Sequence, residues 1–532
     1  MSNRFRLSIL IFFVFSGFSF LVFDIYNLQI QKGEYYFERA KSQRLLIDNL
    51  EASRSNIYFI DKYNKQIPVA INKPHPVIFV VPKEINDLEE AVQSLLPILN
   101  IKEKELRSDL QEKDNNYKLL VKKASLDQVN KVNDLELKGV YIDEQKSRFY
   151  PFNNLAAQLL GYVGPNDGGG FVGKYGLELF YDDKLTGNPG EDLILTVDRN
   201  IQAEGEEILA NLVKKFNAAK GSFIVQDPKT GKILAMGDYP TFDPNNYSKA
   251  NLSNFLNQNV QGVYEPGSIF KVFTMAAGLD SGAITPETSY YDAGELKVKD
   301  RIIRNWDLKS YGNTTMTEVI EHSLNIGAAF AEKKTGNKTF YNYLLKFGFS
   351  KLTQIDLPGE VAGNLRNLSE DMNNSVNFAT ASFGQGISVT TLQLIGAISS
   401  LANGGHLMRP IILAKDEPEE VEQVITKDTA QKVVAMMENA LYKAEVGRIE
   451  NYRLAGKTGT AQLAGKGGYT KDVINTYVGF GPVSDPKFTI LFRLEKPVGA
   501  PLAGQTVVPA FRELAQFILN YYNIPPDDLA KE

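Results

Sequence analysis

Ser268 and Lys271 form a Ser-x-x-Lys motif, a spacing that can pair a nucleophile with its base. A serine hydroxyl is a weak nucleophile at neutral pH and needs a nearby proton acceptor. If the segment is helical, the two side chains lie on one face, one turn apart. A Pro-Gly pair precedes the motif and a Ser-Gly pair ends the run of helical spacing, so we expect a helix that begins at Ser268. The free N–H groups at that end would favour the negative charge that develops during acyl transfer.

Two further motifs that could do chemistry follow along the chain: Ser323-Leu324-Asn325 and Lys457-Thr458-Gly459. Each alone is a weak signal, because Ser-x-Asn is more often a solvated helix face and Lys-Thr-Gly more often a turn before a strand. The three motifs in this order are typical of serine acyl-transferases in which lysine replaces histidine as the base. The sequence therefore predicts a serine nucleophile, with no metal ion and no cofactor.

The composition argues against other kinds of site. The chain has no cysteine, which excludes a thiol nucleophile, a cysteine-ligated metal and a disulfide framework. Of the three histidines, His75 and His406 have the sequence context of loops. His322 directly precedes Ser323, and adjacent side chains on a helix point about 100° apart. A Ser-His-Asp triad is therefore disfavoured. The near balance of 58 basic and 63 acidic residues argues against a nucleic-acid-binding protein.

The N-terminal segment Leu7–Phe23 is uncharged and rich in phenylalanine, and Arg4 and Arg6 precede it. Three interpretations of this segment compete: a cleaved signal peptide, a buried core helix and a single transmembrane anchor. The segment lacks a small-residue cleavage site and has no polar face, so we favour an anchor over residues 7–25. The arginines would hold residues 1–6 in the cytoplasm. The protein would then be a single-pass protein of the cytoplasmic membrane, with its larger C-terminal part outside the cell or in the periplasm.

The rest of the 532-residue chain is long enough for two or three domains. Residues 40–190 alternate helical and strand-like segments without a catalytic cluster. From Leu193 onward the residue patterns predict individual elements more clearly. Helices are expected after Asp198 and over Thr390–Ala402. Strands are expected near Lys457 and at Leu193–Val197, Phe223–Gln226, Lys232–Met236, Thr476–Val483 and Phe488–Leu494. Because helices from both ends of this part would pack on one sheet, we expect an α+β domain over residues 193–525.

Over almost its whole length the chain resembles the class B penicillin-binding proteins, the monofunctional peptidoglycan transpeptidases. The matching stretches in the C-terminal part are Asp227–Met236, Tyr264–Lys271, Phe383–Thr390, Ala455–Gln462 and Tyr477–Phe480. Weaker matches to the family's N-terminal domain lie at Arg148–Pro151 and Gly176–Glu178. The resemblance implies a penicillin-binding transpeptidase fold, in which helices flank an antiparallel sheet, preceded by a pedestal or dimerisation-type domain over residues 40–190.

One feature departs from the family pattern. The pedestal usually opens with an Arg-Gly pair, whereas here Arg54 is followed by Ser55. The family's contact between this arginine and a later glutamate is therefore in doubt for Arg54 and Glu178. The short N-terminal part favours the monofunctional architecture over the bifunctional one, which carries a glycosyltransferase domain.

The resemblance implies a role for each catalytic side chain. Ser268 would attack the carbonyl between the two terminal D-alanines of a stem peptide. Lys271 would take its proton, provided that burial and neighbouring cations lower its pKa. Ser323 would pass the proton to the leaving amine, and Asn325 would hold the substrate amide. Lys457 would place positive potential near Ser323 and the substrate carboxylate.

The resemblance also implies a binding surface on the third motif. Thr458, Gly459 and Thr460 would contact the substrate. The backbone N–H of Thr460 and that of Ser268 would form the oxyanion hole. β-Lactams mimic the acyl donor and should remain attached to the enzyme.

Several alternatives stay open beside a division-type (septal) transpeptidase, which we favour from the stretches His322–Gly327, Ile355–Glu360 and Asn475–Phe480. An elongation-type enzyme and a D,D-carboxypeptidase side activity would use the same residues. A β-lactamase is disfavoured, because its Glu-x-x-Leu-Asn string would overlap the Ser323 motif. A non-catalytic penicillin sensor or division scaffold is the alternative outside enzymology. The expected partners are stem peptides, β-lactams, division-complex proteins and a polytopic membrane glycosyltransferase.

Overall fold

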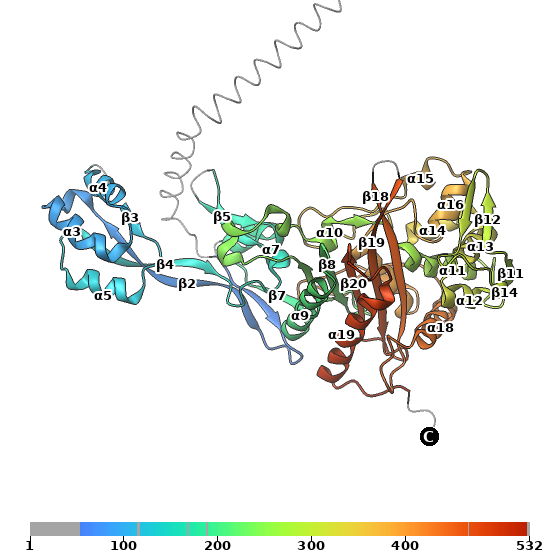
Figure 1. The fold of residues 1–532 in the computed structure, drawn as a ribbon. Coiled ribbons are helices and arrows are strands. Elements are labelled where there is room, and N and C mark those ends of the chain that lie inside the picture. The colour runs from blue at the N-terminus through green and yellow to red at the C-terminus, as the bar shows by residue number, and fades with distance from the viewer. Residues whose placement is uncertain (1–53, 114–117, 168–169, 188–189, 466–467, 529–532) are drawn as a thin grey trace, which may run out of the picture. The chain divides into compact units, whose positions relative to one another are not determined.

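The computed structural model describes residues 54–113, 118–167, 170–187, 190–465 and 468–528 (Figure 1). The predicted cytoplasmic tail and membrane anchor, residues 1–25, lie outside these ranges. None of the helices within the ranges is both long and apolar enough to cross a membrane. The described chain forms two compact units, each built from separate stretches of sequence. The first contains Arg54, Asn72–Arg148 and Val163–Val172, and the second contains Ser55–Ile71, Phe149–Tyr162 and Gly173–Glu532.

The first unit packs three helices beside strands, as Figure 1 shows around β3. Its helices are α3 (Leu88–Leu99), α4 (Glu103–Gln111) and α5 (Leu126–Asp134), with a 3-10 turn at η3 (Pro82–Glu84). The strands of this region are β2 (Ile67–Val80), β3 (Lys118–Val121), β4 (Val140–Phe149), β5 (Tyr162–Pro165) and β6 (Phe171–Lys174). The core contains Ile78 and Val80 of β2 and the apolar stripe of α3, including Val92 and Leu95. The alternation of helical and strand-like segments predicted for residues 40–190 is present in the described part of this unit.

The second unit is organised around a five-stranded sheet in the order β18-β19-β20-β8-β9. Every neighbouring pair in it is antiparallel. Its strands are β8 (Lys220–Gln226), β9 (Ile233–Tyr239), β18 (Ala455–Gly465), β19 (Gly468–Gly481) and β20 (Phe488–Glu495). β18 therefore lies at one edge, where its outer side is free to face the segment that carries Ser268.

Helices cover both faces of this antiparallel sheet, so the apolar side chains of each face are buried. The helices α9 (Arg199–Lys215) and α19 (Val507–Tyr521) pack on one face, whereas α11 (Lys271–Asp280) lies on the other (Figure 1). The helix α17 (Thr391–Ala402) shares its core with α11 and contacts β8, β19 and β20. Side chains alternate between the two faces along a strand. Phe223 and Val225 of β8 accordingly join the core under α9 and α19, and Ile224 joins the opposite core.

The remaining elements of this unit surround the sheet. The helices are α6 (Ala157–Leu160), α7 (Gly176–Phe180), α8 (Asp182–Thr186), α10 (Gln258–Gln261), α12 (Met316–His322), α13 (Asn325–Thr335), α14 (Asn337–Lys346), α15 (Arg366–Ser369), α16 (Ser375–Ala381) and α18 (Lys427–Ala444). Short 3-10 helices occur at η4 (Pro244–Lys249), η5 (Leu252–Phe255), η6 (Gly267–Phe270) and η7 (Ala503–Gln505). Short strands are β1 (Ile57–Ile60), β7 (Leu193–Asp198), β10 (Val263–Tyr264), β11 (Ser289–Asp292), β12 (Glu295–Val298), β13 (Arg301–Arg304), β14 (Gly312–Thr315), β15 (Val389–Thr390), β16 (His406–Met408) and β17 (Glu420–Gln423).

Most sequence-based expectations for this unit are confirmed. Asp198 caps α9 by accepting the N–H groups of Asn200 and Ile201. The strands predicted at Phe223–Gln226 and Lys232–Met236 are present and pair as the hairpin of β8 and β9. The predicted helix after Thr390 and the predicted strand at Lys457 are present as α17 and β18. The predicted strand over residues 476–483 differs at both ends, because β19 already begins at Gly468 and stops at Gly481. Pro482 follows, and proline has no N–H to continue the ladder.

Candidate active site

Ser268 lies in the 3-10 turn η6, which runs directly into α11. The helix predicted to begin at Ser268 is present, but its first turn is the 3-10 turn η6, and the α-helix itself begins at Lys271. Gly267 enters the turn with a φ of 56°, and the N–H of Lys271 bonds back to the Ser268 carbonyl three residues earlier. A 3-10 turn is the tighter form of helix and often opens an α-helix. Ser268 and Lys271 still occupy one face, because residues three apart eclipse each other in such a turn.

The structure places the two polar groups of the first motif in contact. The Nζ of Lys271 lies 3.0 Å from the Oγ of Ser268. Lys271 is completely buried, while Ser268 is partly exposed. The helix is anchored in the core on the opposite side, where Phe270 and Phe273 pack on Phe349. The lysine side chain is therefore held against the serine by a rigid element.

Ser323 ends α12 and meets the same lysine. It has left-handed backbone angles (φ 57°, ψ 48°), and its N–H bonds to the carbonyl of Val319. The Nζ of Lys271 donates to the Ser323 carbonyl at 2.5 Å and lies 3.2 Å from the Ser323 Oγ. The Nζ of Lys457 lies 2.9 Å from the same hydroxyl oxygen. Ser323 Oγ is therefore shared between two lysines.

The third motif approaches the nucleophile turn along the edge strand β18. Lys457 is the third residue of this strand and is buried. Gly459 permits the close approach, since a Cβ atom at this position would lie 2.7 Å from the Pro266 carbonyl oxygen and 3.1 Å from the Ile269 side chain. Positions 457 and 459 share one face of the strand, because successive residues alternate between faces. Any larger residue than glycine at 459 would push the strand away from Ser268.

The backbone of Thr460 faces the nucleophile turn, whereas its hydroxyl bonds to other segments of the chain. Its carbonyl oxygen would lie 3.0 Å from a Cβ placed on Gly267, so it points toward the nucleophile turn. The N–H and C=O of one strand residue point the same way, so the Thr460 N–H faces that turn too. The Thr460 hydroxyl instead donates to Asn475 Oδ1 and accepts the N–H of Ala503, both at 3.3 Å.

Ser268, Lys271, Ser323 and Lys457 form a four-residue cluster. Two of the predicted binding residues, Asn325 and Thr458, lie next to it and have hydrogen-bond partners of their own. The Nδ2 of Asn325, at the start of α13, donates to the carbonyl of Arg304 at 2.8 Å. Thr458 accepts from Lys457 Nζ through its carbonyl at 3.2 Å and its hydroxyl at 3.4 Å. The structure thus brings all eight predicted residues to one region around the lysines, with Asn325 at its rim.

Burial controls the charge of both lysines. Removal from water lowers the pKa of Lys271 well below its ordinary value, and the nearby Lys457 lowers it further. Burial alone lowers the pKa of Lys457 to about 7. Desolvation disfavours the charged form of an amine. The arrangement therefore favours a neutral Lys271, which can accept a proton from Ser268. Among the described residues, no cluster of carboxylate and histidine side chains could hold a metal ion.

A contact that the sequence does not predict ties the β18–β19 hairpin to the nucleophile segment. The hydroxyl of Tyr469 donates to the carboxylate of Glu265, at 3.0 Å and 2.9 Å from its two oxygens. Glu265 also accepts the N–H of Gly386 at 2.9 Å. Glu265 belongs to the nucleophile box, but nothing in the sequence links it to a tyrosine 204 residues away.

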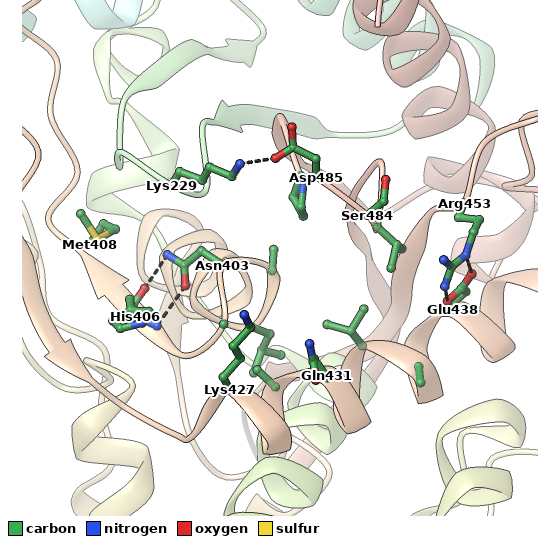
Figure 2. A pocket seen from close by; sticks show the side chains of 18 of the residues that line it. Lys229, Asn403, His406, Met408, Lys427, Gln431, Glu438, Arg453, Ser484 and Asp485 are labelled. Atoms are coloured by element: carbon green, nitrogen blue, oxygen red, sulfur yellow. Dashed lines mark hydrogen bonds and ion pairs between the residues drawn. The ribbon is translucent and has the colours of Figure 1, made fainter. Parts of the chain in front are cut away.

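A pocket of about 820 Å³ lies elsewhere in the same unit, and none of the eight predicted residues lines it (Figure 2). Its lining includes two ion pairs, Lys229 with Asp485 and Arg453 with Glu438. Asn403 bonds to both the N–H and the carbonyl of His406. The serine in its lining, Ser484, donates to Asp527 and not to a lysine, unlike Ser268 in the candidate active site.

Comparison with known families agrees with this geometry. Residues 221–516 match the penicillin binding protein transpeptidase domain, and residues 49–222 match the penicillin-binding protein dimerisation domain. The chain belongs to the class B penicillin-binding proteins. Both the resemblance stated from the motifs and the α+β transpeptidase fold with an N-terminal dimerisation domain are confirmed. The boundaries predicted at residues 190 and 193 stay a prediction.

Individual proteins are similar to this chain over most of its length. Stage V sporulation protein D of Bacillus subtilis is 32% identical over 83% of this chain and 74% of its own length. Peptidoglycan D,D-transpeptidase FtsI of Escherichia coli K12 is 27% identical over 96% of this chain and 91% of its own. The crystal structure of penicillin binding protein 2X from Streptococcus thermophilus has the same fold, with a TM-score of 0.75 at 22% identity, and the match covers 89% of this chain and 80% of that one.

Proposed function

We propose that Ser268 is the acylated nucleophile of this serine-type peptidoglycan D,D-transpeptidase and that Lys271 is its base. The observation that carries the assignment is the 3.0 Å contact between Lys271 Nζ and Ser268 Oγ, made by a completely buried amine. Membership of the family makes the chain a D-Ala-D-Ala transpeptidase, so the substrate is the stem peptide of peptidoglycan. The individual residue roles are the proposal.

The first half-reaction forms the acyl-enzyme. Neutral Lys271 takes the proton of Ser268 as Oγ attacks the carbonyl carbon of the penultimate D-alanine. The N–H groups of Ser268 and Thr460 stabilise the oxyanion, which the orientation of the Thr460 backbone supports. The bond to the terminal D-alanine nitrogen then breaks. Its proton comes from Lys271 through the Ser323 hydroxyl, which lies 3.2 Å from Lys271 and 2.9 Å from Lys457.

The second half-reaction transfers the acyl group. The amine of a second stem peptide attacks the ester carbonyl and loses a proton to Lys271. Ser268 Oγ leaves and regains that proton, so the cross-link forms without a net change in the enzyme. A β-lactam opens its ring on the same serine, but its leaving amine stays tethered to the acyl group, which blocks the approach of an acceptor.

The remaining predicted residues hold the substrate in this scheme. Asn325 directs its carbonyl oxygen to the peptide amide, while its Nδ2 is fixed on Arg304. Protonated Lys457 and Thr458 meet the terminal carboxylate, supported by their mutual contact. Gly459 gives room for the strand to lie beside the nucleophile. Thr460 binds mainly through its backbone, because its hydroxyl is engaged with Asn475 and Ala503.

Labelling with a fluorescent penicillin tests the nucleophile. The wild-type protein should become covalently labelled, and Ser268→Ala should lose the label while keeping its thermal unfolding temperature. Ser253→Ala, an exposed serine in the same domain, serves as the control and should label normally. Mass spectrometry should find the adduct on the peptide that contains Ser268, and an adduct on Ser323 would contradict the assignment.

The cellular setting is part of the proposal. Similarity to FtsI over 96% of this chain supports septal rather than elongation-type synthesis. We infer that residues 7–25 anchor the enzyme beside a polytopic membrane glycosyltransferase and division-complex proteins. A chain that starts at Gln43 should be soluble and still react with penicillin, yet fail to support growth. A mature N-terminus near Asp24 in protein purified from cells would contradict the anchor.

A further inference from the structure

The turn that carries Ser323 is held from both sides by one segment at the end of β13. The indole Nε1 of Trp306 donates to the carbonyl of His322 at 3.0 Å, directly before Ser323. The carbonyl of Arg304 accepts from the Asn325 side chain at 2.8 Å, two residues after Ser323. Left-handed backbone angles are unfavourable for a residue other than glycine and persist where the surroundings fix them. These two hydrogen bonds help to hold the backbone of Ser323 in this conformation.

The residue between the two contacts, Asn305, makes the central bonds. Its Oδ1 accepts the backbone N–H of Asn325 at 3.1 Å and that of Ile326 at 3.4 Å. Both N–H groups belong to the first turn of α13 and have no acceptor within the helix. Asn305 is 1% exposed, so water does not replace it. The side chain thus fixes where α13 begins and, with it, the residue that ends α12.

The amide of Asn305 is oriented by a buried carboxylate. Its Nδ2 donates to both oxygens of Asp292, at 3.1 Å and 3.0 Å, and to the carbonyl of Lys309 at 3.1 Å. An ionised carboxylate only accepts hydrogen bonds, so the amide nitrogen must face Asp292 and the amide oxygen must face α13. Asp292 is completely buried, and Tyr290 and Gly294 donate to it at 2.7 Å and 2.8 Å. Every polar atom of this network has a partner.

We propose that Asn305 is a positioning residue for acylation, oriented by Asp292, and that it acts by holding Ser323 between the two lysines. The inference rests on the proposed function. Its physical basis is that the Ser323 carbonyl and hydroxyl are both within hydrogen-bond distance of Lys271 Nζ, at 2.5 Å and 3.2 Å. Any shift of the turn changes both contacts at once. Misplacement by about 1 Å at a reacting group can lower a rate about 100-fold.

The test compares Asn305→Ala with a matched variant. Asn259 is also a completely buried asparagine that donates to a buried aspartate, Asp238, at 3.3 Å, and to a backbone carbonyl. Stopped-flow kinetics with a fluorescent penicillin separates the dissociation constant of the initial complex from the acylation rate constant. Asn305→Ala should lower the acylation rate constant about 10–100-fold with little change in the dissociation constant. Asn259→Ala should leave both within about threefold.

A second variant isolates the orientation of the amide. In Asp292→Asn the new side chain both donates and accepts, so Asn305 loses its fixed orientation while the volume stays the same. We expect this variant to lower the acylation rate constant in the same way, by a smaller factor. Acylation by Asn305→Ala at the wild-type rate, or equal losses in the Asn305 and Asn259 variants, would overturn the proposal.

Hydrogen–deuterium exchange separates this inference from the proposed function, because it needs no activity. In the wild-type protein the amides of Asn325 and Ile326 should be protected, and in Asn305→Ala a peptide over residues 323–327 should exchange at least about tenfold faster. The same peptide should be unchanged in Asn259→Ala. Unaltered exchange in Asn305→Ala would refute the positioning role even if Ser268 is the nucleophile. Loss of labelling in Ser268→Ala tests the nucleophile alone.

Discussion

The Nζ of Lys457 lies 2.9 Å from the Oγ of Ser323, although 134 residues separate them in the chain. On its other side the same hydroxyl lies 3.2 Å from the Nζ of Lys271. Among the described residues no carboxylate is close enough to raise the pKa of either amine. Two buried amines that share one hydroxyl cannot both be charged at low cost. The pair can therefore hold one proton between them at neutral pH, which is what a relay between nucleophile and leaving group needs.

Lys271→Arg tests whether the first lysine acts as a base or only as a charge. Arginine keeps the positive charge but does not release its proton in proteins. Acylation by penicillin should fall at least about 100-fold, the lower end of general-base effects. Lys432→Arg, at an exposed lysine paired with Asp428, is the control and should acylate normally. Near-normal acylation of Lys271→Arg would show that this side chain contributes only charge.

The pH dependence of acylation should follow the two lysines in opposite directions. The acylation rate should rise with pH as Lys271 loses its proton, because only the neutral amine is a base. Since the pKa of Lys271 is lowered, this rise should occur below the pH range in which lysine usually titrates. The rate should fall again as Lys457 loses its charge, with an apparent pKa of about 7. Stopped-flow acylation rates between pH 5 and 10 give the profile, and a rate that keeps rising through pH 9 would contradict the role of charged Lys457.

Gly459→Ala should separate the edge strand from the nucleophile. The added Cβ would lie 2.7 Å from the carbonyl oxygen of Pro266, which is backbone and cannot rotate away. Inserting a methyl group into a packed site costs about 1–3 kcal/mol of the free energy of unfolding. We expect the acylation rate to fall at least about tenfold, since β18 carries the N–H of the oxyanion hole. Gly504→Ala, with nothing within 4 Å of its new Cβ, should leave both the melting temperature and acylation unchanged.

Glu332 predicts a pH dependence of stability that is separate from catalysis. This carboxyl on α13 is 3% exposed, its Oε1 has no hydrogen-bond partner among the described residues, and burial raises its pKa to about 7. The folded state therefore binds more protons than the unfolded state between pH 4.5 and about 7, so the free energy of unfolding falls as pH rises through this window. Above it the whole penalty applies.

Glu332→Gln removes this ionisation and should stabilise the protein by about 1–3 kcal/mol at pH 8, with little gain at pH 4.5. Urea unfolding at the two pH values measures the difference. Glu370→Gln, an exposed glutamate, should show no such change. An equal effect of Glu332→Gln at both pH values would mean that the carboxyl does not titrate in this window.

Local sequence patterns predicted the elements of this fold that depend on local interactions. The cap at Asp198, the β8–β9 hairpin and the apolar helix after Thr390 each follow from residues close together in the chain. The helix expected from Ser268 opens as a 3-10 turn before α11, and sequence spacing does not distinguish a 3-10 first turn from an α-helical one.

For the candidate site, only the residues of the three motifs could be predicted from the sequence. Their order suggests one site, but their convergence depends on β18 being an edge strand beside η6, which no single segment encodes. Asn305 could not be identified, because a lone buried asparagine has no sequence signature of its own. The occupied hydroxyl of Thr460 was equally hidden, since its partners Asn475 and Ala503 come from distant segments.

Ser323 occupies a backbone conformation that glycine adopts freely and serine does not. Glycine at this position would relieve a steric cost of about 1 kcal/mol but would remove the hydroxyl between the lysines. At position 323 the side chain that activity requires therefore lowers the stability of the folded enzyme. Selection for thermal robustness alone would drive position 323 toward glycine, and only the need to move a proton keeps serine there. Laboratory evolution for stability should for this reason be run with penicillin acylation as a simultaneous requirement.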